Sequence, residues 1–248
     1  MDSVKAIVLA AGKGRRLNSD QAGIPKVLRP VNGRPMLAYV LDALSFLPAE
    51  DVIIVTGYMS EQVQRQFPTY QYAFQETQDG TGDAVKCAVK LLAGYDGSIL
   101  VCCGDMPLLE SASYQKLLEE HRTKENACTI LSSICTLPLH CGKILRDADD
   151  RFVQIIEERD CTPEQLMIQE VNSGVYVFDS SALFRGLLGL TNHNKQGEYY
   201  LTDVPYLIKK DRGKVGICKM NLGDQIIGIN TPEHLALAEH ILSSRGSV

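Results

Sequence analysis

Short apolar runs alternate with amphipathic segments through the first half of the 248-residue chain, and this alternation restricts the folds that it can adopt. Strands that alternate with helices are typical of a parallel sheet with helices on both faces. The ranges predicted as strands are 4–9, 52–55, 70–74, 98–103 and 127–136. The ranges predicted as helices are 36–46, 60–67, 82–92 and 111–122, with Ser60 as the N-cap of the second.

The pattern changes after about residue 139. Two short strands, 143–146 and 151–156, are predicted on either side of an acidic turn, and a charged stretch leads to a further strand at 171–178. Such an excursion usually forms a small lobe on a sheet. We therefore expect an α/β fold with a doubly wound, mostly parallel, Rossmann-like sheet and a small β-rich lobe inserted in the second half. A helix at 204–210, a strand at 214–219 and a helix at 232–242 complete one continuous domain over residues 1–248.

Charge and cysteine content exclude several classes of function. The net charge is -5 and the pI about 5.6, whereas a general nucleic-acid binder is usually basic, so no nucleic-acid partner is expected. No apolar stretch approaches the roughly 18 residues of a membrane span, and the first apolar run is too short for a signal peptide. The eight cysteines include no C-x-x-C pair, which favours reduced thiols in the cytoplasm. The oligomeric state is left open.

A glycine-rich stretch, L-A-A-G-K-G-R-R-L, follows the first predicted strand. Gly12 and Gly14 let backbone N–H groups approach an anion, and Lys13, Arg15 and Arg16 add positive charge. This combination favours a triphosphate over a single phosphate. The spacing matches neither the P-loop nor the dinucleotide fingerprint, and an ordinary flexible turn explains the same residues equally well.

Two charged residues are candidates for the chemistry. Asp105 follows the 98–103 strand at the carboxyl edge of the predicted sheet, where a carboxylate suits Mg²⁺ or simply caps the next turn. Lys26 stands among apolar neighbours in P-K-V-L, and it either reaches the phosphates as a point charge or extends from a packed segment to solvent.

The stretch that contains Gln75, Gly80 and Thr81 is the candidate base site. A Gln amide can pair with a base edge, and Gly80 permits close approach of the backbone to a ring. The alternative is a glycine-rich turn in which Thr81 caps the helix that follows.

Polar residues of the second half are candidates for sugar binding. Glu157 and Asn172 lie at predicted strand ends, and Gly142 would allow close approach. Exposed Glu and Asn are common, so spacing alone is a weak indication. Asn230 is either the cap of the last helix or a second metal-side oxygen.

Taken in order, the motifs resemble those of the sugar-1-phosphate nucleotidyltransferases. The motifs are L-A-A-G-K-G-R-R-L, P-K-V-L, Gln75 with G-T-G, G-D-M-P-L, I-Q-E-V-N-S-G and Q-G-E-Y-Y-L-T-D. The last two are similar to those of one bacterial family, the uridylyltransferase domains of bifunctional N-acetylglucosamine-1-phosphate uridylyltransferase/glucosamine-1-phosphate acetyltransferases. The resemblance extends over nearly all of residues 4–242.

The resemblance implies a role for each candidate. Arg16, Lys26 and Asp105 would be catalytic, and Asp105 with Asn230 would hold Mg²⁺. The nucleotide would contact Leu9, Ala10, Ala11, Gly12, Lys26, Gln75, Gly80, Thr81, Cys103, Gly104 and Asp105. The sugar would contact Gly142, Glu157, Asn172 and Asn230, which makes the small lobe a sugar-binding lobe.

The chain departs from the family pattern at four places. Cys103 and Cys141 stand where the family has tyrosine, Asp83 replaces the histidine of G-T-G-H-A, and residues 21–24 lengthen the glycine-rich loop. These differences concern sugar packing and loop closure more than the reaction. No hexapeptide-repeat β-helix is seen, so no left-handed β-helix acetyltransferase domain is expected in these residues.

The implied reaction is Mg²⁺-dependent, in-line transfer of UMP from UTP to N-acetylglucosamine 1-phosphate, which yields UDP-N-acetylglucosamine, a cell-wall precursor, and pyrophosphate. A related enzyme for another sugar 1-phosphate, such as glucose 1-phosphate, or for another nucleotide is one alternative. A non-catalytic nucleotide-sugar-binding regulatory module is the other.

Overall fold

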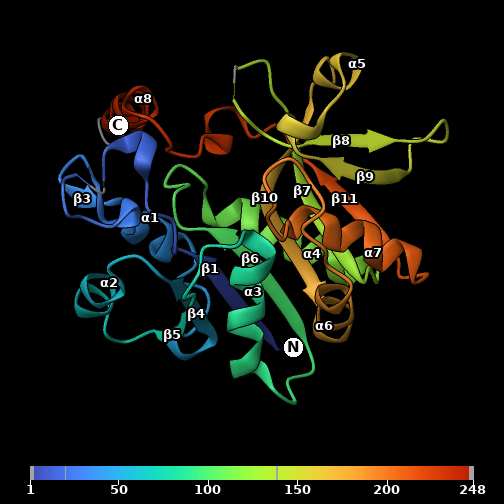
Figure 1. Cartoon of the computed structure of the whole chain (residues 1–248), viewed down its shortest axis with the longest axis horizontal. Helices are drawn as coiled ribbons and strands as arrows, with labels where there is room; N and C mark the ends of the chain where they lie inside the picture. The colour runs from blue at the N-terminus through green and yellow to red at the C-terminus, as the bar shows by residue number, and fades with distance from the viewer. Residues whose placement is uncertain (1–2, 20, 138, 246–248) are drawn as a thin grey trace.

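A nine-stranded sheet forms the centre of the protein (Figure 1). The computed structural model describes residues 3–19, 21–137 and 139–245. Along the main path of the sheet the strand order is β11-β7-β10-β6-β1-β4-β5. These strands are β1 (Val4–Leu9), β4 (Val52–Thr56), β5 (Gln71–Phe74), β6 (Ser98–Cys103), β7 (Cys128–Ile134), β10 (Glu170–Asp179) and β11 (Val215–Lys219).

Strand β10 runs against its neighbours, whereas the other main-path pairs are parallel. It lies between β6 and β7 and is irregular between Asn172 and Tyr176, where Gly174 adopts a φ of 80°. The first residues of β10 therefore lie at the same edge of the sheet as the carboxyl ends of β1 and β6. The mostly parallel α/β sheet is confirmed, but its antiparallel central strand was not predicted from the sequence.

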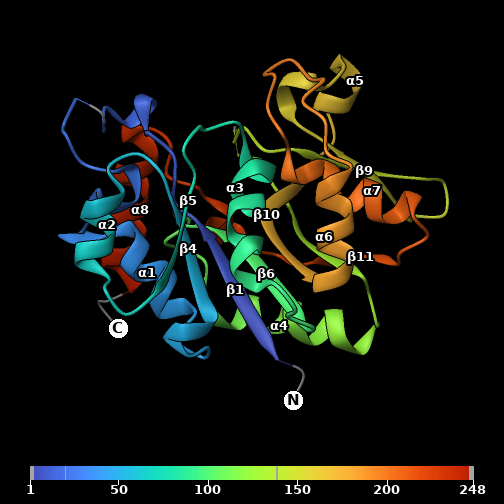
Figure 2. The same ribbon diagram turned by 60° about the horizontal axis from the view of Figure 1, so that its bottom comes forward.

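Helices cover both faces of the sheet, as the doubly wound prediction requires (Figure 2). Ala6 and Val8 of β1 belong to one core and Ile7 to the other, which accounts for the continuous apolar run at residues 6–9 of this strand. The first core receives side chains from α1 (Met36–Ala43), α2 (Ser60–Gln66), α4 (Ser111–Thr123) and α8 (Pro232–Arg245). The second receives them from α3 (Thr81–Val89), α6 (Ser180–Leu188) and α7 (Val204–Lys210).

The predicted small lobe consists of β8 (Lys143–Arg146), β9 (Phe152–Ile156) and the short helix α5 (Pro163–Leu166). Strands β8 and β9 form an antiparallel hairpin, and β8 joins the sheet through the pair Lys143–Val171 of β10. In Figure 1 the lobe projects from the sheet beyond β10.

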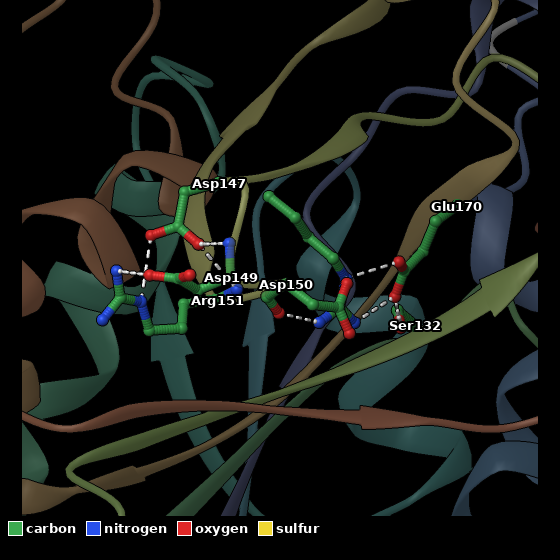
Figure 3. Close-up of polar contacts among 7 residues, drawn as sticks. Ser132, Asp147, Asp149, Asp150, Arg151 and Glu170 are labelled. Atoms are coloured by element: carbon green, nitrogen blue, oxygen red, sulfur yellow. Dashed lines mark hydrogen bonds and ion pairs between the residues drawn. The ribbon is translucent and has the colours of Figure 1, made fainter.

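Charged side chains of the hairpin are engaged in structural contacts (Figure 3). Arg146 donates two hydrogen bonds of 2.8 Å to the carboxylate of Glu170, which also accepts from Ser132 at 2.6 Å. Burial alone would raise the pKa of Glu170, but these donors hold it below its ordinary value. In the acidic turn, Asp147 accepts hydrogen bonds of 3.0 Å from the backbone N–H groups of Asp149 and Arg151. The turn is thus closed by its own side chain.

Several local features differ from the sequence predictions. Ser60 is not an N-cap: Met59 precedes α2 with a φ of 52°, and the Ser60 hydroxyl accepts from Gln64 at 3.0 Å. Helix α6, helix α5 and the small hairpin of β2 (Pro30–Val31) and β3 (Arg34–Pro35) were not predicted. Across the described ranges, no helix combines the length and apolar character needed to span a membrane.

Candidate active site

Two adjoining cavities open at the carboxyl edge of the parallel strands, where the sequence motifs converge. The first has a volume of about 260 Å³ and the second of about 220 Å³. The first is lined by nucleotide candidates: Leu9, Ala10, Ala11, Gly12, Lys26, Gln75, Gly80, Thr81, Cys103 and Asp105. The second is lined by the sugar candidates and by Arg16: Gly142, Glu157, Asn172 and Asn230. Because Leu9, Thr81, Cys103 and Asp105 line both, the two cavities meet at the end of β6.

The glycine-rich loop is held by the sheet at its start and by Lys26 at its middle. Gly104 donates its N–H to the Leu9 carbonyl at 2.9 Å, which joins the ends of β1 and β6. Gly14 has a φ of 65°, and a Cβ there would lie 2.8 Å from the Cβ of Lys26, so the loop folds directly over this lysine. The extra residues of the loop form a turn anchored to α2 by a 3.1 Å hydrogen bond from Gln62 to the Gly23 carbonyl.

Four predicted residues meet where the cavities join. The Lys26 ammonium contacts the Asp105 carboxylate and donates to the Asn230 amide oxygen at 2.8 Å. Arg16 donates to the same oxygen at 3.2 Å, across 214 positions of sequence. The N–H of Ile229 bonds to the Asp105 carbonyl at 2.8 Å and so places Asn230 beside Asp105.

The alternative readings of Lys26 and Asn230 are wrong. Only 11% of the Lys26 side chain is exposed, so it does not extend to solvent. Thr231 caps the last helix, because its hydroxyl accepts the N–H of His234 at 3.3 Å, and Asn230 faces the junction instead.

Oxygen atoms of Asp105 and Asn230 make the junction suitable for a hard cation. Mg²⁺ in nucleotide sites is usually bound by one or two protein oxygens and completed by phosphate oxygens and water. Within ranges 3–19, 21–137 and 139–245, no three His, Cys, Asp or Glu side chains form a metal cluster. The two protein oxygens of Asp105 and Asn230 therefore fit a metal ion whose remaining ligands are phosphate oxygens and water.

The base candidates are tied to one another. Gln75 is 3% exposed, and its amide nitrogen donates to the Gly80 carbonyl at 3.0 Å and to Asp83 at 2.8 Å. Thr81 is the first residue of α3 and makes no side-chain cap, so that alternative is wrong. Its hydroxyl instead accepts the N–H of Leu201 at 3.0 Å.

Residues 199–202, within Q-G-E-Y-Y-L-T-D, connect the two cavities. Tyr199 donates its N–H to the Asp79 carbonyl at 2.7 Å and accepts the Gly82 N–H at 2.8 Å. Three residues later, the Thr202 hydroxyl donates to Glu157 at 2.9 Å. The resemblance singles out this motif as family-specific but implies no role for Thr202. Its hydroxyl, a possible hydrogen-bond donor to a carboxylate, is the sequence signal that could have indicated this contact.

Three of the four sugar candidates, Gly142, Glu157 and Asn172, form one wall of the second cavity. The N–H of Asn172 donates to the Gly142 carbonyl at 2.9 Å, and a Cβ on Gly142 would lie 3.7 Å from a Glu157 carboxylate oxygen. The Asn172 amide donates to the Tyr176 hydroxyl at 2.6 Å and accepts the N–H of Gly174 at 3.2 Å. Asn172 is therefore fixed by the irregular part of β10.

Cys103 and Cys141 line the second cavity, where the family has tyrosines. Burial raises the pKa of Cys103 well above its ordinary value and that of Cys141 to about 12, so both thiols are protonated near neutral pH. Smaller, uncharged side chains thus stand at these two places in the wall.

Burial raises the pKa of Glu157 above its ordinary value of 4.5, and the carboxylates of Asp203, Asp160 and Glu198 raise it further, against the hydrogen bond from Thr202. The folded protein then binds more protons than the unfolded chain between pH 4.5 and the raised pKa, so stability falls as pH rises through this window.

Replacement of Glu157 with Gln should remove this loss of stability with rising pH, because the amide does not ionise. The amide oxygen can still accept the hydrogen bond from Thr202. In urea denaturation from about pH 4.5 to pH 7.5, the free energy of unfolding of Glu157→Gln should rise relative to that of the native protein as pH increases. Glu76→Gln, which removes an exposed carboxylate, is the control. A difference that does not change with pH would contradict the assignment.

Comparison with known proteins identifies the family of the chain. The family model of the MobA-like NTP transferase domain matches residues 6–157. The bifunctional protein GlmU of Clostridium tetani (strain Massachusetts / E88) and that of Geobacillus thermodenitrificans (strain NG80-2) are each 42% identical to the chain. These matches cover 97% of this chain and 52% of each relative, so the chain spans about half the length of the curated relatives it matches.

A solved structure shares the fold at low sequence identity. A Bacillus anthracis protein with the provisional name glucose-1-phosphate thymidylyltransferase, in complex with a sucrose, superposes with a TM-score of 0.73 and 20% identity. The alignment covers 96% of this chain and 95% of that chain. Because this family model matches more than half of the residues of the chain, the chain belongs to the family of MobA-like NTP transferase domains and is a nucleotidyltransferase.

Proposed function

We propose that the chain transfers UMP from UTP to N-acetylglucosamine 1-phosphate in the cytoplasm, which yields UDP-N-acetylglucosamine and pyrophosphate. The observation that carries the proposal is the junction of two cavities at Lys26, Asp105 and Asn230. A nucleotide in the first cavity and a sugar phosphate in the second would bring their phosphates together at this junction. The choice of substrates rests on the family resemblance of the motifs I-Q-E-V-N-S-G and Q-G-E-Y-Y-L-T-D, and the 42% identity to the GlmU relatives is in keeping with that resemblance.

The proposed chemistry is a single in-line displacement. A phosphate oxygen of the sugar phosphate forms a bond to the α-phosphorus of UTP, and the bond from that phosphorus to the bridging oxygen of pyrophosphate breaks. The nucleophile is already ionised near neutral pH, so no side chain has to remove a proton. Catalysis then depends on positioning and on neutralising the phosphates.

Each member of the junction has a role in this scheme. Lys26 and Arg16 neutralise charge on the triphosphate, and backbone N–H groups of the glycine-rich loop orient it. Asp105 and Asn230 would hold Mg²⁺, which supplies charge neutralisation at the phosphate oxygens when bound. The Lys26 contact keeps both oxygens turned toward the junction.

A grid of substrates tests the proposal. Pyrophosphate release would be measured with UTP, CTP, TTP, ATP and GTP against the 1-phosphates of N-acetylglucosamine, glucosamine and glucose, with and without Mg²⁺. UTP with N-acetylglucosamine 1-phosphate should give the highest kcat/KM, at least about tenfold above the other pairs, and turnover should require Mg²⁺. A higher value for glucose 1-phosphate or another nucleotide would replace the proposed substrates. Tight binding of UDP-sugar without turnover would indicate the regulatory module instead.

A further inference from the structure

The amide of Gln75 is held in one orientation by two acceptors. Its nitrogen donates to the backbone carbonyl of Gly80 and to the carboxylate of Asp83, at 3.0 and 2.8 Å. A carbonyl oxygen and a carboxylate cannot donate a hydrogen bond, so the opposite orientation would place the amide oxygen against two other acceptors. The contacts themselves therefore determine which end of this amide is nitrogen.

Only the amide oxygen of Gln75 is left for a ligand. Both N–H groups are used, and the oxygen has no hydrogen-bond partner among the described residues, nor is it one of their fully buried unpaired atoms. Gln75 also lines the first cavity together with Gly80 and Thr81. The base end of this cavity thus offers an acceptor and no donor from this side chain.

An acceptor in this place discriminates between pyrimidines. Uracil and thymine carry an N3–H between two carbonyl groups, and this imide N–H donates to an amide oxygen. Cytosine has an unprotonated N3, which is an acceptor and would face the Gln75 oxygen without a hydrogen. A buried site that leaves two acceptors in contact loses binding energy.

Of the residues that hold the Gln75 amide, Asp83 departs from the family pattern, which has histidine at this position. It lies in the first turn of α3, where the amino end of the helix favours a carboxylate. The side chain is partly buried, and its carboxylate accepts the hydrogen bond of 2.8 Å from Gln75. A histidine can donate or accept, whereas an ionised aspartate only accepts and so admits only one orientation of the Gln75 amide.

We propose that Asp83 is a positioning residue that selects an imide base by fixing the Gln75 amide with its oxygen toward the first cavity. The inference rests on the proposed function, because it places the nucleotide base in that cavity. The inference adds the determinant of base choice to the proposed function. Uracil-type nucleotides are accepted and cytosine nucleotides are rejected through Asp83, which itself does not touch the base.

The test compares UTP with CTP in the native protein and in Asp83→Ala and Asp83→Asn. Dissociation constants would be measured by equilibrium binding, and kcat/KM with N-acetylglucosamine 1-phosphate. The native protein should prefer UTP by about a hundredfold or more, and Asp83→Ala should reduce this ratio about tenfold, because one charge-assisted hydrogen bond that fixes the amide is lost. Asp83→Asn should keep the ratio within about threefold, since its amide oxygen still accepts from Gln75.

Asp79→Ala is the matched control. Asp79 is exposed in the same loop, and its carboxylate accepts from Thr77 at 2.7 Å without contacting Gln75. The variant therefore removes the same charge, and its UTP-to-CTP ratio should equal that of the native protein. The ratio is measured on one preparation with both nucleotides, so a partly unfolded fraction cancels from it.

The outcomes separate the two proposals. An unchanged ratio in Asp83→Ala, or an equal fall in Asp79→Ala, would overturn the role of Asp83 and leave the proposed reaction standing. UTP binding with the expected ratios but without turnover would remove the proposed reaction and support the role of Asp83. A native protein that fails to bind UTP, or that binds CTP equally well, would overturn the inference.

Discussion

Replacement of Lys26 with Met should lower kcat by about a thousandfold and leave the fold intact. The ammonium is the cation that contacts both Asp105 and Asn230, and loss of one preorganised charged donor at a reacting phosphate typically costs two to three orders of magnitude. Met preserves the aliphatic stem on which the loop packs at Gly14, so the change tests the charge rather than the packing. Steady-state pyrophosphate release measures the effect, with thermal unfolding as the check on folding.

Lys5→Met provides the comparison. Lys5 forms a partly exposed ion pair with Asp51 at 2.6 Å, near the start of β1 and away from both cavities. Its loss removes a lysine–aspartate pair without touching the junction, so kcat should stay within about twofold of the native value. Near-native kcat in Lys26→Met, or equal losses of kcat in both variants, would contradict the role of the Lys26 charge at the junction.

The second large effect is expected at Gly80. Its φ of 112° is rarely adopted by other residues, and a Cβ there would lie 2.5 Å from the backbone oxygen of Tyr199. It would also lie 2.9 Å from the backbone nitrogen of Tyr199. The backbone of Tyr199 cannot move aside without breaking the hydrogen bonds between residues 79–82 and 199–201. Gly80→Ala should therefore lower the free energy of unfolding by about 2–4 kcal/mol and the Tm by roughly 6–12 °C. It should also raise the KM for UTP at least about tenfold, because the Gly80 carbonyl holds Gln75.

Gly94→Ala separates the steric contact from the backbone angle. Gly94 has a φ of 75°, and nothing lies within 4 Å of the position of its Cβ. The substitution should cost only about 1–2 kcal/mol for the left-handed conformation, and it should leave the KM for UTP unchanged. Equal stability losses in the two variants, measured by urea denaturation, would contradict the proposed contact with Tyr199.

The parallel part of the fold was predictable because its signals are local. Apolar strands such as β1 are buried on both faces, and helical spacing marks the segments between them. The antiparallel placement of β10 was not predictable, since its partners β6 and β7 lie far earlier in the chain and no residue of 170–179 encodes direction. Ser60 suits an N-cap by type, yet Met59 takes the left-handed conformation and moves the cap position by one residue.

The site residues were predictable as a set but not as a network. Glycines and charges after strand ends could be placed at one edge of the sheet, and the structure brings Lys26, Asp105 and Asn230 into contact there. The partners Thr202 of Glu157 and Asp83 of Gln75 come from tertiary contacts. The first pair is separated by 45 positions and the second by eight, across a loop and the first turn of α3, and periodicity and spacing describe neither distance.

The position of β10 between β6 and β7 also determines when the sheet can complete its folding during synthesis of the chain. The segment matched by the family model stops at residue 157, before this strand has been made. A nascent chain of that length has β6 and β7 but lacks the strand that separates them, so both carry bare edges that invite pairing with other chains. The end of the family-model match is therefore not a boundary of folding, and the sheet is completed only when residues 170–179 insert between β6 and β7, which are synthesised earlier.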